Sequence, residues 1–378
     1  NFSIRIYNPV LQRAQLSYPM YVFAAACCWR QLNQRMHGKL LLVDGAVGIT
    51  GGRNYQDDYY DWDPHYNFRD RDVLVAGPEV RAMWRNFEAF WNDPRSVPAA
   101  RLTDVGGHLL AHGVPPVELG RYERPERAAA AKAKAGDDAL LRERVAGRAM
   151  RVGAVHYVAD LPAKHREGPD EPGGDDASRM LRDLIESAED EVLLQTPYLV
   201  LSDAASEMFE ALHDRPDAPR VIVSTNSLAA TDAFMVYALS HKYKRTFLRD
   251  YGFHIYEYKP FPGDAPIDIA LTGAAEQPAE TPPPVETARV ERGSALRRRL
   301  RTETRPSFLA SGAVTEPVRL KRAGLRIGLH AKSLVVDERV GVVGTHNFDP
   351  RSDHYNTEGM LVVPDAAFAT ALADSNRR

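Results

Sequence analysis

Short apolar runs alternate with longer amphipathic stretches in the carboxyl-terminal half of this chain. The pattern predicts helices over 178–188, 204–213 and 232–250, and buried strands over 191–195 and 220–224. Strands that alternate with helices are typical of a largely parallel sheet covered by helices. We therefore expect an α/β fold in this half of the chain.

Two other apolar segments form an internal repeat of eighteen residues. Residues 37–54 read HGKLLLVDGAVGITGGRN, and residues 330–347 read HAKSLVVDERVGVVGTHN. In both copies Lys follows His by two residues, Asp by seven, Gly by eleven and fourteen, and Asn by seventeen. One such pattern is expected by chance roughly once in 10⁴ chains of this size, so two copies indicate a duplication.

Each copy predicts a β-hairpin. The strands are expected at 40–43 and 47–50 in the first copy, and at 333–336 and 340–343 in the second. Asp44-Gly45 is a strong signal for a two-residue turn, and Asp337-Glu338 is a weaker one. Positions i and i+2 of a strand share a face, so each histidine and the lysine two residues later point the same way.

The hairpin geometry separates the roles of the repeated residues. Asp44 lies about 23 Å from His37 along a strand, so it is expected to cap the turn rather than to orient the histidine. The returning strand brings Gly51 and Asn54 back beside His37, as it brings Gly344 and Asn347 back beside His330. A glycine there would allow a substrate to approach the backbone, and an Asn amide can donate to a phosphoryl oxygen.

A second repeat supports the duplication. Residues 2–9 and 253–260 both read F-x-I-x-x-Y-x-P, and each is a plausible strand leading toward its hairpin. The copy at 253–260 follows two β-α units, whereas the copy at 2–9 follows a single residue. We therefore expect about two β-α units to precede Asn1 in the full-length protein.

The charge balance and the cysteines exclude some classes of protein but do not identify a binding partner. The 378 residues carry 48 Lys and Arg against 51 Asp and Glu, a net charge of −3, which argues against a nucleic-acid partner. Cys27 and Cys28 are adjacent, which excludes a disulfide framework. The uncharged stretch 14–29 is too short and too polar for a membrane span, so it predicts a packed helix or, alternatively, a membrane-docking one.

At the two repeats the sequence resembles the phospholipase D superfamily, whose HxKx₄D motif is matched at His37 and again at His330. The second copy continues as NFDPRS, then Asn356 and Glu358, which is similar to the bacterial phosphatidyltransferase pattern GxxNxDxRSxxxNxE. The segments GGRNYQDDYYD, NFRDRDVLVAGP and TNSLAATD are similar to the third class of bacterial cardiolipin synthases.

The resemblance implies an α/β fold of two pseudo-symmetric β-α-β halves. Their mixed, mostly parallel sheets would be flanked by helices, with the active site at the interface between the halves. We expect the first half at 1–95, incomplete at its amino terminus, a connecting helical region at 96–175, and the second half at 176–378. An insertion at 261–320, ending in the arginine-rich segment 289–305, is expected to be disordered.

The resemblance also implies the chemistry and the catalytic set, which comprises His37, Lys39, Asp44, His330, Lys332 and Asp337. One imidazole attacks phosphorus and forms a phosphohistidine, and the other protonates the leaving alcohol. The amino-terminal histidine is the favoured nucleophile. The lysines, with Asn54 and Asn347, would stabilise charge on the phosphoryl oxygens, so neither a metal nor another cofactor is expected.

Further residues complete the predicted site. Carboxylates that orient the histidines should come from the strand after each hairpin, with Glu358 in the second half and Asp70 or Asp72 in the first. Asn226 and Ser227 end a strand at the carboxyl edge of the sheet, where ligands bind in open α/β folds, and Ser352 follows the second motif. We expect these three residues to contact the substrate.

The favoured function is a phosphatidyltransferase of the cardiolipin synthase type, acting on phosphatidylglycerol with phosphatidylethanolamine as a possible donor. We expect it at the bacterial cell membrane, as a peripheral protein or one anchored by a segment before Asn1. The alternative is a phospholipase D or nuclease-like phosphodiesterase, for which water is the acceptor. A non-catalytic lipid-binding protein would not need two intact motifs.

Overall fold

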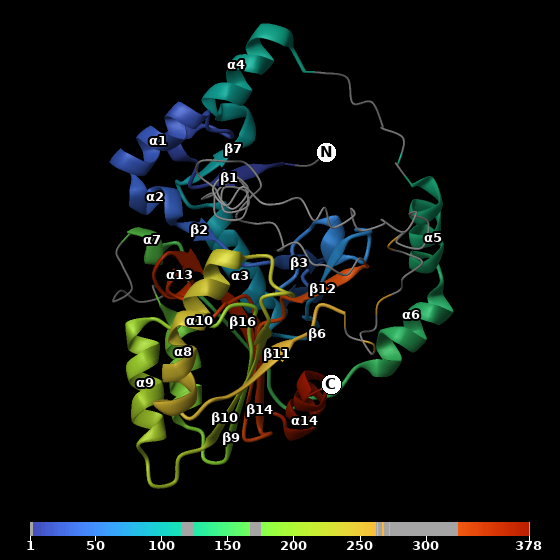
Figure 1. Cartoon of the computed structure of the whole chain (residues 1–378). Helices are drawn as coiled ribbons and strands as arrows, with labels where there is room; N and C mark the ends of the chain where they lie inside the picture. Colours follow the sequence, from blue (N-terminus) through green and yellow to red (C-terminus); the bar gives the residue numbers. More distant parts are fainter. Residues whose placement is uncertain are drawn as a thin grey trace, which may run out of the picture. The chain divides into compact units, whose positions relative to one another are not determined.

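The computed structural model describes residues 3–114, 122, 124–166, 175–261, 263, 267, 272 and 324–377. The predicted insertion at 261–320, including its arginine-rich end, lies almost entirely outside these residues. The described chain forms two compact units (Figure 1), one of residues 1–35 and 89–154 and the other of residues 36–88 and 155–378. Both predicted halves contribute residues to the second unit, which carries both motifs.

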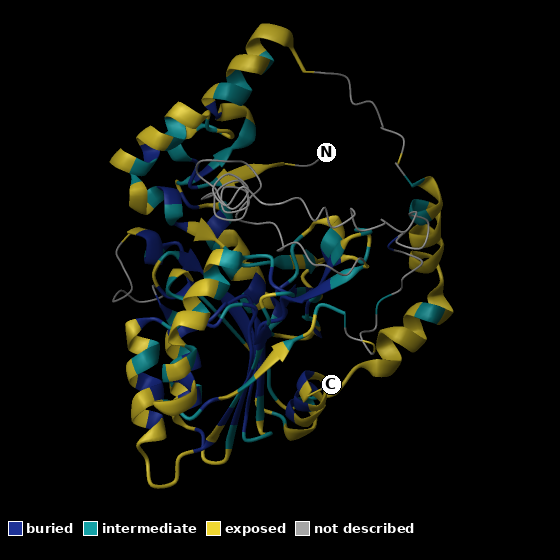
Figure 2. Ribbon diagram, in the orientation of Figure 1, coloured by how far each residue is buried: buried dark blue, intermediate teal, exposed yellow. Residues whose placement is uncertain are grey.

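The first unit is mostly helical. Its two strands, β1 (Arg5–Tyr7) and β7 (Ser96–Pro98), pair antiparallel. Its α-helices are α1 (Tyr18–Cys27), α2 (Trp29–Asn33), α4 (Thr103–His112), α5 (Pro125–Ala135) and α6 (Asp138–Arg144). The 3-10 helices are η1 (Val10–Gln12), η3 (Ala99–Arg101) and η4 (Ala146–Arg148). Helices α5 and α6 bury no side chain (Figure 2), as expected for a surface helical region.

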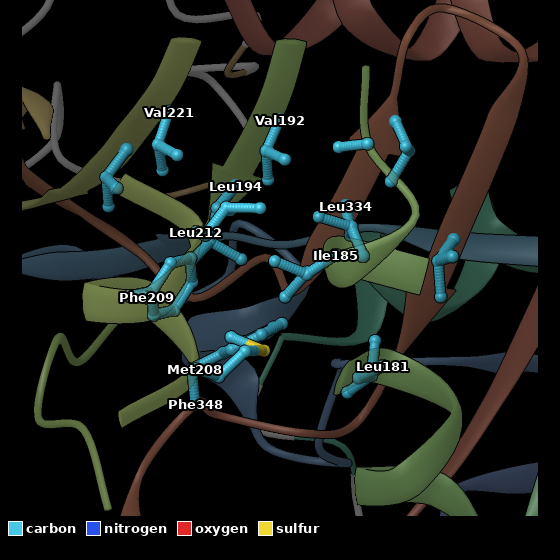
Figure 3. Close-up of a cluster of buried hydrophobic side chains, with 14 of the residues drawn as sticks. Leu181, Ile185, Val192, Leu194, Met208, Phe209, Leu212, Val221, Leu334 and Phe348 are labelled. Atoms are coloured by element: carbon cyan, nitrogen blue, oxygen red, sulfur yellow. The ribbon is translucent and has the colours of Figure 1, made fainter. Parts of the chain in front are cut away.

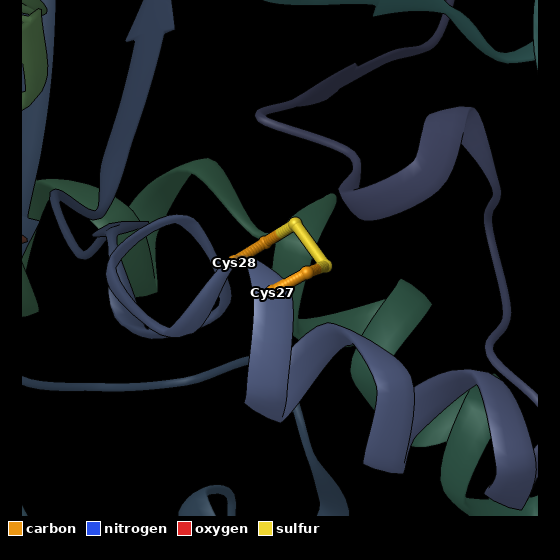
Figure 4. The surroundings of a disulfide bond; sticks show 2 residues. All are labelled: Cys27 and Cys28. Atoms are coloured by element: carbon orange, nitrogen blue, oxygen red, sulfur yellow. A yellow bond between two sulfur atoms is a disulfide. The ribbon is translucent and has the colours of Figure 1, made fainter.

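Helix α1 is apolar but poorly covered. Only Ala24 is buried in it, whereas Tyr18, Val22 and Phe23 are exposed, so the predicted packing of this segment is wrong. The helix ends in a disulfide between neighbours Cys27 and Cys28 (Figure 4), which cross-links no distant parts of the chain. Among the helices of the described residues, none is long and apolar enough to cross a membrane.

The second unit is built on a seven-stranded sheet in the order β11-β10-β9-β13-β14-β16-β8. Its strands are β8 (His156–Ala159), β9 (Glu191–Gln195), β10 (Arg220–Asn226), β11 (His254–Tyr258), β13 (Ser333–Val336), β14 (Val340–Gly344) and β16 (Gly359–Val363). The predicted mixed α/β architecture is confirmed. The prediction that the sheet is mostly parallel is wrong, because only β9, β10 and β11 pair in parallel. Strands β13 and β14 pair antiparallel because a short turn joins them, and the pairs β13–β9, β14–β16 and β16–β8 are antiparallel as well.

Helices cover both faces of this sheet. One face packs against α8 (Asp176–Glu186), α9 (Asp203–His213) and α10 (Phe234–Arg249) through a cluster that includes Leu194, Phe209 and Leu334 (Figure 3). The opposite face packs against α14 (Ala366–Arg377) through Leu193, Val335 and Leu372. Adjacent strand residues face opposite helices, so these strands are apolar throughout.

A second sheet of three antiparallel strands carries the first motif. Its order is β3 (Leu40–Val43), β4 (Val47–Gly51) and β6 (Asp72–Ala76). Both predicted hairpins form in the same register, since Leu40 stands opposite Thr50 and Ser333 stands opposite Val343. Val75 of β6 packs with Leu361 of β16, which brings the two sheets together.

The hairpin turns adopt the backbone that their sequences predict. Asp44 and Gly45 have φ values of 53° and 65°, and Asp337 and Glu338 have φ values of 51° each. Positive φ at both central residues is the geometry that matches the twist of hairpin strands.

Shorter elements complete the second unit. They are β5 (Tyr66–Arg69), β12 (Arg326–Leu329), β15 (Asn356–Thr357), η2 (Asp57–Tyr59), α7 (Ala163–Arg166) and α13 (Pro350–His354). Strand β2 (Arg35–Met36) and helix α3 (Val80–Trp91) span the boundary between the units.

Candidate active site

The two histidines stand at equivalent places, each just before the first strand of its hairpin. The strand after each hairpin supplies an equivalent carboxylate. Asp72 on β6 is opposite Gly51, and Met360 on β16 is opposite Gly344. Asp70 and Glu358 each lie two residues earlier, so they are related by the same pseudo-symmetry.

The carboxylates are exchanged between the motifs. The His37 Nδ1 is 2.8 Å from Oε2 of Glu358, and the His330 Nδ1 is 2.6 Å from Oδ2 of Asp70. The prediction that each carboxylate orients the histidine of its own half is wrong. Of the two candidates in the first half, Asp70 makes the contact, whereas Asp72 binds the Arg53 side chain at 2.6 Å.

Backbone pairing explains the exchange. Strand β12, which leads to His330, pairs in parallel with β5, which leads to Asp70. The His330 N–H donates to the Arg69 carbonyl at 2.8 Å, and the His37 N–H donates to the Thr357 carbonyl at 3.0 Å. Each histidine is therefore held beside the residue that precedes the carboxylate of the other motif.

These contacts fix the histidine tautomers. A carboxylate accepts only from a protonated Nδ1, so each imidazole keeps its Nε2 for chemistry or for a different donor. The pKa of Glu358 is held well below its usual range by His37, against the effect of burial. Lys332 and His330 likewise lower the pKa of Asp70, so both carboxylates are ionised at neutral pH.

The two lysines sit differently beside their histidines. Lys39 Nζ donates to the His37 carbonyl at 2.8 Å. Lys332 Nζ lies against the His330 ring, 2.9 Å from Nδ1 and 3.1 Å from Nε2, and also donates to the His330 carbonyl. Burial lowers the pKa of Lys39 to about 8 and that of Lys332 to about 7.

Burial also lowers the pKa of both histidines, because it disfavours the charged imidazolium. For His37 the shift is opposed by Glu358 and increased by Lys39 and Lys332. For His330, burial and the adjacent Lys332 together lower the pKa to about 3. Each lysine acts on the histidine of the other motif, so the two motifs share one electrostatic environment.

Aromatic rings pack against His330. Its ring lies 5.1 Å from that of Tyr59, edge to face, and 5.2 Å from that of Phe68. The side chain of His330 is 7% exposed, whereas that of His37 is 24% exposed. His37 is therefore the more accessible of the two imidazoles.

The asparagines lie where the repeat predicts, but only one has a partner for its amide. Asn54 Nδ2 donates to the Tyr59 hydroxyl at 2.9 Å. The buried Oδ1 of Asn347 has no hydrogen-bond partner among the described residues, while Asn347 N donates to Ser352 Oγ at 3.2 Å.

The glycines serve strand packing rather than a phosphate. A Cβ at Gly344 would lie 2.5 Å from Cβ of Met360, and a Cβ at Gly51 would overlap the Arg71 carbonyl and Asp72. The expected contact of Gly51 and Gly344 with a substrate is therefore corrected, because the neighbouring strand fills the space.

The motif aspartates lie at the hairpin turns and do not join the histidines. Asp337 accepts from the backbone N–H groups of Glu189, Asp190 and Glu191, at 2.8 to 3.0 Å. Asp44 is exposed at the equivalent turn. Asp337 therefore ties its hairpin to the segment before β9 instead of capping its own turn, and no contact joins either motif aspartate to a histidine among the described residues, as the catalytic role implied by the resemblance would require.

Two of the three residues predicted to contact the substrate form hydrogen bonds within the protein instead. The Asn226 side-chain amide bonds to both backbone groups of Leu329. It donates to the carbonyl at 2.7 Å and accepts from the N–H at 2.8 Å. Ser352 is fully buried and accepts from Asn347 N. Both brace residues of the second motif instead of facing a substrate, whereas Ser227 is half-buried at the end of β10.

A buried ion pair behind the site carries no sequence signal. Lys164 Nζ donates to Asp160 Oδ2 at 2.8 Å and to the Ser352 carbonyl at 3.0 Å. Asp160 Oδ2 also accepts from Glu358 N at 2.9 Å, so the pair fixes the backbone of Glu358 and of Ser352. A Lys four residues after an Asp is common in any helix-rich sequence, which is why the sequence analysis missed it.

The chain is similar to several known proteins. The family "Cardiolipin synthase, PLD-like domain" matches residues 301–376. Cardiolipin synthase C of Escherichia coli is 27% identical over 382 residues, which cover 98% of this chain and 66% of that protein. An uncharacterized protein of Helicobacter pylori is 25% identical over 372 residues, and this chain spans 61% of its length.

The fold has a counterpart among solved structures. The crystal structure of phosphatidylserine synthase from Haemophilus influenzae superimposes with a TM-score of 0.50 at 13% identity, over 91% of this chain and 62% of that one. The likeness confirms the fold that the two motifs predict. Residues 301–376 therefore match a phospholipase D-like domain of the cardiolipin synthase family, and the chain as a whole is similar to cardiolipin synthase C.

Proposed function

We propose that this chain carries the active site of a phosphatidyltransferase of the cardiolipin synthase type. It would move a phosphatidyl group from a donor phospholipid, through a phosphohistidine, to phosphatidylglycerol. The exchanged pairing of the two histidines with Glu358 and Asp70 carries the proposal, since it builds one two-histidine site from both motifs. Similarity to cardiolipin synthase C supports the choice of lipid substrates.

His37 is the proposed nucleophile. Among the described residues, its ring has a hydrogen bond to Glu358, through Nδ1, which leaves Nε2 of this more exposed histidine free. Nε2 would attack phosphorus and form a P–N bond while the P–O bond to the donor headgroup breaks. The lowered pKa of His37 keeps this imidazole neutral, as a nucleophile must be.

His330 is the proposed acid and base. A phosphodiester that binds between the lysines offsets the positive charge that lowers its pKa, so His330 gains a proton once the substrate is bound. It would give this proton to the leaving oxygen, with Asp70 stabilising the imidazolium. In the second step it would take the proton of the acceptor hydroxyl, whose oxygen attacks phosphorus as the P–N bond breaks.

Lys39, Lys332, Asn54 and Asn347 are proposed to stabilise the phosphoryl oxygens. Lysine cations and amide N–H groups lower the energy of the developing negative charge when they are already in place. The two buried lysines fit such a role.

We place the enzyme at the bacterial membrane surface, either peripheral or anchored. The exposed side chains of Tyr18, Phe23 and Trp29 support a contact with lipid. Aromatic side chains of this kind lie at the level of the lipid headgroups in proteins that bind membrane surfaces.

The test supplies phosphatidylglycerol, with and without phosphatidylethanolamine, to the full-length protein and identifies the products by mass. Cardiolipin is the expected product, and the His37→Ala variant should form none. Phosphatidic acid alone would show a hydrolase. Cleavage of nucleotide diesters without any lipid product would contradict the lipid assignment.

A further inference from the structure

A carboxylate and a phenol lie together beside the His330 side of the site. The Tyr198 hydroxyl donates to the carboxylate of Asp232, 3.0 Å from Oδ1 and 3.1 Å from Oδ2. Tyr198 follows β9, and Asp232 ends the loop after β10. Ligands of open α/β sheets bind at the carboxyl ends of such parallel strands.

Several contacts hold the loop 227–232 near His330. The Tyr66 hydroxyl donates to the Ala230 carbonyl at 2.6 Å, and Tyr66 packs on Phe68 with ring centroids 4.9 Å apart. Phe68 in turn contacts the His330 ring. Asn226, just before the loop, holds Leu329, the residue that precedes His330.

The Asp232 carboxylate interacts electrostatically with the proposed reacting groups. Its oxygens can also accept further hydrogen bonds. It is partly exposed, and it interacts with Lys332 and with the phenols of Tyr59 and Tyr66. Burial raises the pKa of Asp232, and Tyr198 and Lys332 oppose this shift. Its ionised form has about four lone-pair sites, and a single phenol proton from Tyr198 cannot occupy them all.

A carboxylate at the edge of a phosphate-binding site favours some ligand groups over others because of its charge. It repels a second phosphate and attracts groups that donate hydrogen bonds. A buried hydrogen-bonding site rejects an analogue that lacks the matching donor, because its own polar groups would be left unpaired. Since His330 is the proposed base for the acceptor hydroxyl, the acceptor headgroup must come to this side of the site.

We propose that Asp232 and Tyr198 form the binding site for the headgroup of the acceptor, where they recognise a hydroxyl group other than the one that reacts. The acceptor class is therefore a polyol headgroup of the glycerol type. This inference rests on the proposed function, because only a transferase has an alcohol acceptor.

The experiment compares soluble acceptors of equal length in the full-length protein. Glycerol and 1-propanol compete with water for the phosphatidyl group, and each transfer product is measured against phosphatidic acid. We expect the wild-type protein to prefer glycerol, and Asp232→Asn to reduce the glycerol to 1-propanol preference by about tenfold. Tyr198→Phe should reduce it less.

Glu257→Gln is the matched control, because Glu257 is a carboxylate that also accepts from a tyrosine, at 3.2 Å from the Tyr237 hydroxyl, on the exposed strand β11. It should leave the preference unchanged. An unchanged preference in Asp232→Asn would overturn the inference and leave the transferase standing. Loss of transfer to ethanolamine alone would overturn the hydroxyl assignment in favour of an ammonium. Phosphatidic acid as the only wild-type product would overturn both the inference and the proposed function.

Discussion

The two motif hairpins have the same sequence pattern and the same register, yet they stand in different surroundings. Strand β13 is buried along its whole length, with β9 on one side and β14 on the other. Strand β3 is half exposed and pairs with β4 on one side only among the described residues. Residues 37–54 and 330–347 are therefore equivalent in local geometry and unequal in burial.

The two histidines also differ in how far their surroundings bury them. His330 is enclosed by Lys332, Tyr59 and Phe68, whereas His37 keeps an accessible ring. A duplicated motif thus supplies two imidazoles whose environments differ, which is what a division into nucleophile and acid requires. Because each carboxylate contacts the histidine of the other motif, neither half forms a complete site by itself.

The largest expected effect separates the two histidines. His37→Ala should lower turnover by about 10⁴-fold or more, since the covalent route is lost, and His330→Ala by about 10²- to 10⁴-fold. With a labelled phosphatidyl donor, His330→Ala should still form an acid-labile enzyme adduct, and His37→Ala should form none. An adduct in His37→Ala, absent in His330→Ala, would reverse the assignment.

The exchanged carboxylates should give the next largest effect. Glu358→Gln and Asp70→Asn preserve shape but remove the charge that holds each tautomer, so each should lower turnover by about 10²- to 10⁴-fold. Glu358→Gln should slow formation of the adduct on His37, and Asp70→Asn should slow its transfer to the acceptor. Single-turnover kinetics distinguish the two steps, and the opposite pattern would mean that each carboxylate serves its own half.

A matched pair of leucines tests the unequal burial. Leu334 is 0% exposed and Leu41, its equivalent in the other hairpin, is 46% exposed. Leu334→Ala should lower the free energy of unfolding by about 2–5 kcal/mol, because it leaves a cavity, and Leu41→Ala by less than about 1 kcal/mol. Urea denaturation measures both, and equal losses would show that the first hairpin is covered in the full-length protein.

The smallest expected effect concerns pH. The pKa values of Lys332, about 7, and Lys39, about 8, lie below the usual 10.4 or so, so Lys332 loses its charge around pH 7 and Lys39 around pH 8. The value of kcat/KM, which reports the free enzyme, should therefore fall several-fold on the alkaline side of neutrality. The Lys332→Arg variant stays charged at these pH values and should shift the alkaline fall in kcat/KM to higher pH. A fall at unchanged pH would exclude Lys332 as the cause of the fall.

Much of the site was predictable because the repeat fixes both residue type and spacing. The hairpins, their turns and the histidine–lysine pairs follow from local periodicity and turn chemistry. The strand expected after each hairpin gave Glu358 in the second half, and Asp70 or Asp72 in the first. The contacts of Ser352, Asn226 and Gly344 were not predictable. Each depends on a neighbour that is distant in the sequence or on another strand, so the same residue type could equally have faced a substrate.

The sequence by itself determined that two copies of one hairpin present two histidines and two lysines, because side-chain alternation and turn preferences act over a few residues. Only the tertiary structure decided which carboxylate meets which histidine, since β5 pairs with β12 across about 260 residues of chain. It also decided that Lys332 covers the His330 ring while His37 stays open. Burial and charge at each imidazole come from the packing of the whole unit, and no local pattern records them.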